Sequence, residues 1–136
     1  MKFRYFVLLM LCGAAIAQVQ TRWECPDRSK QGRERIRVSD GVTHSLATQS
    51  PLPDVSDLRG QKLDSVVVVG ILISTSGEVI CTSPISGSPD LFKRSQETAL
   101  KWRFKPYEIQ GVYMDVETRI QFQYKKGKVK IVVPNR

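Results

Sequence analysis

The sequence has few of the residues that usually bind metals or carry acid–base catalysis. It contains one histidine and three cysteines in 136 residues. His44 lies in a polar segment with no acidic or cysteine neighbour, so it forms no recognisable ligand spacing. Asp115 and Glu117 alternate with Arg119, a pattern more typical of surface charge than of a catalytic carboxylate pair. We therefore expect no enzyme, no metal site and no cofactor.

The sequence also lacks an apolar run long enough to cross a membrane. The run from Phe6 to Ala17 has 12 residues, whereas a spanning helix needs about 20. Lys2 and Arg4 precede this run, and Ala15-Ile16-Ala17 offers the small residues that signal peptidase requires. We expect residues 1–17 to be a signal peptide, with export and no transmembrane anchor after cleavage. An uncleaved anchor is the alternative.

Export changes how the charge and the cysteines are interpreted. The chain carries a net charge of +8, and the leader contributes two cations and no acid, which leaves +6 in the mature protein. In an exported protein this balance favours anionic envelope surfaces or acidic protein patches over nucleic acid. A positive net charge that serves only to keep the protein soluble is an equally good explanation. Cys25 and Cys81 remain after cleavage, and an oxidising compartment would let them form a disulfide, although two free thiols are also compatible with the sequence.

The first half of the mature chain predicts a polar arm followed by a hairpin. Arg33–Val38 alternates weakly, as a short edge strand would, and Val42–Thr48 suggests another short extended piece. Asp54 could begin a helical turn that ends at Leu58. Val66–Ile73 is β-branched and apolar, and Glu78–Ser83 returns as its partner strand after the polar connection that contains Gly77. Pro84 either ends that strand or places it at a sheet edge.

The second half predicts one helix and one long strand. Ser88, Pro89 and Asp90 suit a helix start, and an apolar stripe follows at a spacing of three to four residues until Lys105-Pro106 ends the helix. From Val112 to Tyr124 the even positions are mostly apolar and the odd positions mostly polar, which indicates a strand with one buried face. We expect a two-layer α+β domain in which this helix crosses a three-stranded antiparallel sheet, with short extra strands N-terminally.

These elements resemble the C-terminal domain of the TonB family of periplasmic energy transducers. The resemblance covers residues 51–124, and it depends on four parts of the sequence. The first two are Ile71-Leu72-Ile73-Ser74 followed by Ser76-Gly77-Glu78-Val79, and then Ser86-Gly87-Ser88-Pro89-Asp90-Leu91. The other two are Lys101-Trp102-Arg103-Phe104-Lys105-Pro106-Tyr107 and the last strand, with Gly111-Val112 and Val116-Glu117-Thr118 to Phe122. The boundaries that follow are a signal peptide (1–17), an arm with short strands (18–50), the TonB-like domain (51–124), and a basic tail or extra edge strand (125–136).

The resemblance implies that the exported protein is periplasmic and has a binding function linked to energised transport. Family members couple an inner-membrane motor to outer-membrane receptors, and their C-terminal domain adds an extended receptor peptide as a strand to the sheet edge. Trp102 and Phe104 would then anchor the core. The expected partner-binding residues belong to the last strand and to the helix exit: Tyr113, Asp115, Val116, Glu117, Arg119, Gln121, Arg103 and Lys105.

Two departures from the family pattern leave a second role open. Full transducers carry a membrane anchor and a long proline-rich spacer, whereas the seven prolines of this chain are scattered. The alternative is an envelope assembly protein that forms homodimers or docks on another protein through the same sheet edge. The segment Lys125–Val133 could pair with the last strand, and in that position it would block the edge.

Overall fold

The computed structural model describes Cys25 and residues 34–134. The expected signal peptide (1–17) and most of the expected arm (18–24 and 26–33) lie outside the described residues. The described part is an α+β structure, in which a mostly β body carries helices. Within this part, no helix is both long and apolar enough to cross a membrane.

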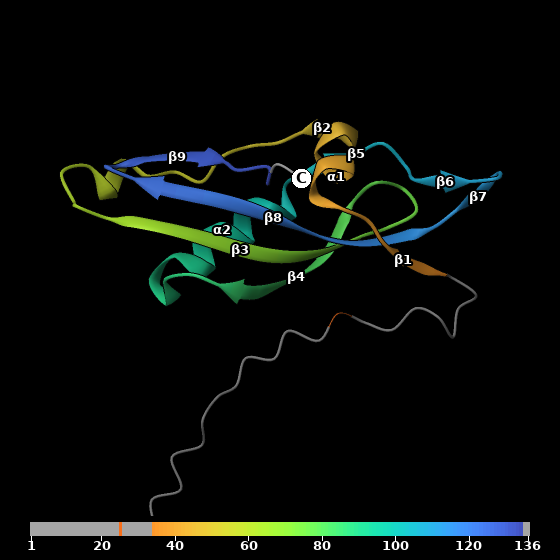
Figure 1. Ribbon diagram of the computed structural model, residues 1–136, viewed down its shortest axis with the longest axis horizontal. Helices are drawn as coiled ribbons and strands as arrows, with labels where there is room; N and C mark the ends of the chain where they lie inside the picture. Colours follow the sequence, from red (N-terminus) through yellow and green to blue (C-terminus); the bar gives the residue numbers. More distant parts are fainter. Residues whose placement is uncertain (1–24, 26–33, 135–136) are drawn as a thin grey trace, which may run out of the picture.

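A five-stranded sheet forms the body of the molecule (Figure 1). Two long strands, β3 (Asp64–Ile73) and β8 (Asp115–Lys125), pair antiparallel along almost their full length. On the other side of β3 lies β4 (Val79–Ser86), the return strand of the predicted hairpin. On the other side of β8 lie two short strands, β1 (Arg35–Arg37) and β9 (Lys128–Ile131). The three expected antiparallel strands form the centre of this sheet, and the expected short N-terminal strand extends it as β1. Of the two alternatives for residues 125–136, the extra edge strand is present as β9. The sheet is mixed because β1 runs parallel to β8.

The helix α2 (Pro89–Leu100) packs across β3 and β4 and closes the core. The core side chains of β3 occupy odd positions and those of β8 occupy even positions, because Val67 faces Phe122 in the β3–β8 register. The predicted alternation holds along β8, where every even position from Val116 to Tyr124 is buried. The opposite face of the sheet is turned away from α2.

Trp102 is the largest side chain in this core, as the sequence predicts. It is 1% exposed, and its Nε1 donates to the Pro51 carbonyl oxygen over 3.0 Å. Its ring lies edge-on to Phe122 and 5.9 Å from the ring of Phe104, which is also buried. The helix α2 ends at Leu100, so the prediction that it continues to Lys105 is wrong, and Trp102 lies just after the helix.

Small elements surround the main sheet, and one of them differs from its prediction. The 3-10 turn η2 (Ser56–Leu58) forms where a helical turn was expected. Residues 40–46 form the helix α1 (Asp40–Leu46), so the extended piece predicted over Val42–Thr48 is wrong except for β2 (Ala47–Gln49). The hydroxyl of Thr43 accounts for part of this difference, because it hydrogen-bonds within the turn to Ser39 O and across to Thr118 Oγ1.

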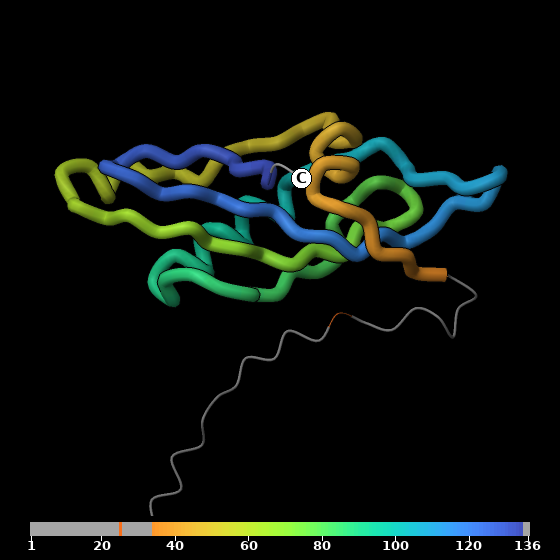
Figure 2. Tube along the Cα trace, viewed as in Figure 1, coloured from red at the N-terminus to blue at the C-terminus, as the bar shows by residue number. Residues whose placement is uncertain are grey.

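Two small two-stranded sheets complete the fold. The strand β2 pairs with β5 (Arg103–Phe104), and β6 (Glu108–Ile109) pairs with β7 (Val112–Tyr113). The predicted strand Val112–Tyr124 is thus broken at Met114, and its first two residues belong to a separate hairpin. The Cα trace in Figure 2 shows this hairpin at one end of the molecule and the β8–β9 turn at the other.

Candidate functional site: the open face of the sheet

The edge expected to receive a peptide is already paired. The outer side of β8 is occupied by β1 from Asp115 to Glu117 and by β9 from Phe122 to Lys125. Single backbone bonds continue this pairing between the two strands: Val38 N donates to Glu117 O over 3.2 Å, and Val132 N donates to Gln121 O over 2.9 Å. The expectation that Val112–Tyr124 lies at the margin of the sheet is therefore wrong.

Side chains close the remaining stretch of this edge. Thr118 Oγ1 donates to the Val38 carbonyl oxygen, and Thr43 Oγ1 donates to Thr118 Oγ1 over 2.6 Å. Asp40, at the start of α1, accepts hydrogen bonds from Arg119 Nε and Gln121 Nε2. Hydrogen bonds to α1 and to the residues just before it thus cover the outer edge of β8 between β1 and β9.

The expected partner-binding residues separate into buried, distant and accessible groups. Asp115 and Val116 are 1% and 2% exposed, so neither side chain can meet a partner in this conformation. Asp115 also contradicts the polar-face prediction. Tyr113 is 55% exposed but lies in the β6–β7 hairpin. Glu117, Arg119 and Gln121 do lie together on the face opposite α2.

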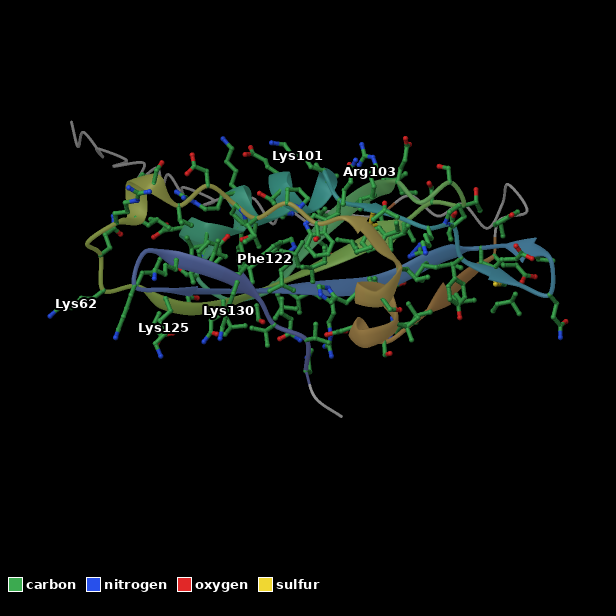
Figure 3. The ribbon with its side chains drawn as sticks, turned by 90° about the horizontal axis from the view of Figure 1, so that it is seen from above. Lys62, Lys101, Arg103, Phe122, Lys125 and Lys130 are labelled. Carbon is green, nitrogen blue, oxygen red and sulfur yellow. A yellow bond between two sulfur atoms is a disulfide. The ribbon has the colours of Figure 1, made fainter. Side chains whose placement is uncertain are left out.

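Arg103 and Lys105 lie away from these β8 residues. Arg103 Nη1 donates to the carbonyl oxygens of Leu100 and Trp102 over 3.0 and 2.8 Å, so its charge covers the end of α2. In Figure 3, Arg103 and Lys101 are on the side of the molecule opposite Lys125 and Lys130. Lys105 is exposed, and its backbone N donates to the Leu46 carbonyl oxygen.

The face opposite α2, which we call the open face, is the accessible surface of the sheet. Its rows follow the β3–β8 register, in which Val66 faces Gln123, Val68 faces Gln121 and Gly70 faces Arg119. Ile85 of β4 borders it and is 55% exposed. A Cβ on Gly70 would come within 2.7 Å of Ser83 Oγ and 3.2 Å of Ile85 Cδ1, so the missing side chain leaves room over β3 for both residues.

A groove of about 750 Å³ is cut into the open face. One wall comes from the segment before and into α1, and another from the middle of β8, with Ile85 and Pro134 adding apolar surface. The lining residues are Arg37, Val38, Ser39, Asp40, Gly41, Ile85, Glu117, Thr118, Arg119 and Pro134. A volume of this size accommodates several side chains of an extended segment.

Paired charges line the groove. Glu117 accepts from Arg35 Nη1 at 3.2 Å and from Arg37 Nη2 at 2.8 Å, and Arg119 Nε lies 3.0 Å from Asp40 Oδ1. The side chains of Arg37 and Arg119 remain 80% and 53% exposed. Their guanidinium groups therefore keep donors available to a carboxylate ligand while staying oriented by their partners.

A second accessible feature is the edge of β4. Among the described residues, no strand lies beyond it, and it offers the longest unpaired edge of the main sheet. Pro84 lies within β4 opposite Val69, as expected for an edge strand. Cys81, in the same strand, forms a disulfide with Cys25, with their Cα atoms 5.6 Å apart.

The groove brings together residues that the sequence could not associate. Of its lining, only Glu117 and Arg119 were expected at a binding site. Asp40-Gly41 carries the pattern of an ordinary turn, and Ile85 follows a proline that ends or edges a strand. No signal in the sequence links residue 37 to residue 117, because their contact depends on the parallel β1–β8 pairing.

The donors near the groove do not form a metal site. In residues 34–134 and Cys25, no group of three or more His, Cys, Asp or Glu side chains could hold a metal ion. Comparisons of the chain with protein families, with curated proteins and with solved structures found no match.

Proposed function

We propose that this protein is a periplasmic protein-binding module that receives an extended segment of an outer-membrane receptor or of another envelope protein. Two features support the proposal. One is the similarity of residues 51–124 to the C-terminal domains of TonB-type transducers, and the other is the groove on the open face. The groove carries the proposal because it combines apolar surface at Ile85 with two oriented guanidinium groups, at Arg37 and Arg119. Such a combination favours a partner segment that alternates apolar and acidic side chains.

This proposal moves recognition away from the last strand. A guest strand on β8 would have to displace β9 or β1 and so lose existing backbone bonds. A guest in the groove loses none of them. Coupling to energised transport remains what the family resemblance implies, and the bound segment would be the mechanical link.

The test is binding of peptides that span the periplasmic N-terminal segments of outer-membrane receptors from the same cell. Ile85→Ser removes apolar groove surface at a largely exposed position, so we expect binding to weaken about 10-fold with little change in stability. Ile109→Ser is the matched control, because Ile109 is similarly exposed but lies in the β6–β7 hairpin. Equal binding by the two variants would exclude the groove.

The free edge of β4 favours a second candidate, an assembly role through strand pairing. Two copies could align their β4 edges antiparallel and extend the sheet across the interface. Sedimentation over a range of concentrations distinguishes the candidates. A reversible dimer that persists in the presence of peptide supports assembly, whereas a monomer that binds peptide supports the groove.

A further inference from the structure

The end of the sheet formed by the β8–β9 hairpin gathers positive charge. Lys125 and Lys128 face each other across the hairpin, and Lys130 faces Gln123 in the next row on the same face. Lys126 occupies the turn, and its backbone N donates to the Leu63 carbonyl oxygen, which brings the segment around Lys62 beside it. The six exposed cations of this cluster are Arg59, Lys62, Lys125, Lys126, Lys128 and Lys130.

Little negative charge offsets the cluster. Asp64 is the acidic residue in these rows, and its Oδ2 lies 4.0 Å from Lys125 Nζ with both side chains more than half exposed. Nearby Asp57 is already occupied by Arg94, which contacts both of its carboxylate oxygens. Figure 3 shows Lys62, Lys125 and Lys130 at this end of the molecule, with Lys125 and Lys130 on the side opposite Lys101.

The backbone of the turn does not explain why Lys126 is a lysine. Lys126 has φ 51° and Gly127 has φ 69°, which is the geometry of a two-residue turn that favours asparagine, aspartate or glycine at the first position. A lysine there adopts the left-handed conformation at some cost to stability. Its charge therefore accounts for the residue better than local structure does.

We propose that this basic end docks onto the surface of an anionic phospholipid bilayer. The cluster is dominated by lysines, and none of its members lines the groove. Lysine ammonium groups without a concave site suit a diffuse layer of phosphate headgroups, where each cation near the surface contributes independently. Val66, which is 41% exposed, lies in the same row as Gln123 and Lys130 and adds an apolar contact. Docking by this end leaves the β6–β7 end pointing away from the membrane.

Vesicle sedimentation with the exported, processed protein tests the proposal. We expect binding to vesicles that contain phosphatidylglycerol, much weaker binding to pure phosphatidylcholine, and a steep loss of binding as salt rises above about 0.1 M. The Lys128→Gln/Lys130→Gln double variant should bind about 25-fold more weakly, since each lysine near such a surface contributes roughly a factor of 5. The matched control, Lys93→Gln/Lys101→Gln, removes the same charge from exposed residues of α2 and its C-terminal end.

The Lys126→Asn variant separates the effect of the lysine charge on vesicle binding from the effect of the substitution on stability. This variant removes one cation and places a favoured residue in the turn, so stability should hold or rise while vesicle binding falls about 5-fold. Equal losses in the two double variants would show that net charge alone drives binding and would overturn the proposal. Binding to phosphatidylcholine as strong as to phosphatidylglycerol would overturn it as well. Peptide binding in the groove serves as an independent readout, which neither double variant should change.

Discussion

The Tyr124 hydroxyl lies between α2 and the sheet, 2.6 Å from the Ser95 hydroxyl. Burial raises the pKa of Tyr124 above its ordinary value of 10.0, because the core disfavours the phenolate. Its contribution to stability is therefore fully present below pH 10 and is lost as pH rises through the raised pKa. Removing the hydroxyl leaves Ser95 Oγ without this partner.

Tyr124→Phe should lower the free energy of unfolding by about 1–2 kcal/mol. Urea denaturation at neutral pH measures this change. The Tyr124→Phe/Ser95→Ala double variant removes both polar groups, so it should lose less than the two single variants added together. Strict additivity would show that the two hydroxyl groups do not interact.

Arg94 anchors η2 to α2 through a second polar contact. Its guanidinium donates to both carboxylate oxygens of Asp57 at 2.8 and 2.7 Å and to the Asp54 carbonyl oxygen at 2.7 Å. The hydrogen bond from Arg94 lowers the pKa of Asp57 below its ordinary value of 3.8. Stability from this pair is therefore present above that value and is lost as pH falls through the lowered pKa.

Arg94→Gln should raise the titration midpoint of the Asp57 carboxyl group toward its ordinary value. An NMR titration of the side-chain carboxyl carbons measures the midpoint in each variant. Lys93→Gln, at the exposed neighbouring position of α2, removes a positive charge without removing the hydrogen bond and should leave the midpoint nearly unchanged. A shift of the same size in both variants would assign the effect to general charge.

At the scale of elements, the turn between β3 and β4 depends on one glycine. Gly77 has φ 86°, and a Cβ there would overlap the Phe104 carbonyl oxygen. The Gly77 carbonyl oxygen also accepts from Phe104 N over 2.9 Å, which fastens β5 to this turn. Gly111, between β6 and β7, has φ 81° but no heavy atom within 4 Å of the corresponding position.

These two glycines form a matched pair for a stability experiment. Gly111→Ala should cost about 1 kcal/mol, which is the strain of the left-handed conformation alone. Gly77→Ala should cost about 3 kcal/mol or more, because the backbone of β5 must also move. Thermal denaturation of both variants measures the difference between the two losses of stability. Equal losses would mean that the backbone of β5 can move without destabilising the protein.

The sequence predicts elements well where the pattern is local. Val66–Ile73, Glu78–Ser83 and the start of α2 at Pro89 are visible in β-branched runs, a glycine turn and a capping pattern. The apolar stripe predicts a helix that continues past Leu100, because Trp102 fits the stripe although it packs into the core after α2 has ended. The sequence does not predict α1, because its seven residues contain a glycine and two β-branched residues, so its stability depends on contacts with β8.

At the scale of the whole molecule, one covalent bond ties a distant segment to the sheet. The disulfide joins Cys25 to Cys81 across a sequence separation of 56 residues. Closing a loop of this length restricts the unfolded chain and should stabilise the fold by about 4 kcal/mol. Comparing melting temperatures with and without reductant measures the effect. The Cys25→Ser/Cys81→Ser double variant should match the reduced protein and show no response to reductant.

The sequence could not predict the sheet order, and this decides the location of the site. The alternation from Met114 to Tyr124 is the same whether β8 lies at an edge or in the interior, because alternation reports burial of one face and not pairing of the two sides. The pairing of β8 depends on β1 and β9, which contribute only three and four residues. Strands this short carry weak patterns, so the sequence leaves pairing of Lys125–Val133 with the last strand as one of two alternatives, and the structure decides between them.

Hydrogen exchange along β8, with and without a bound receptor peptide, tests the central claim most directly. If the partner occupies the groove on the open face, the amides of Phe122–Lys125 should stay protected, and new protection should appear around Val38–Gly41. Loss of pairing between β9 and β8, followed by protection of β8 by the peptide itself, would contradict this account and return recognition to the last strand.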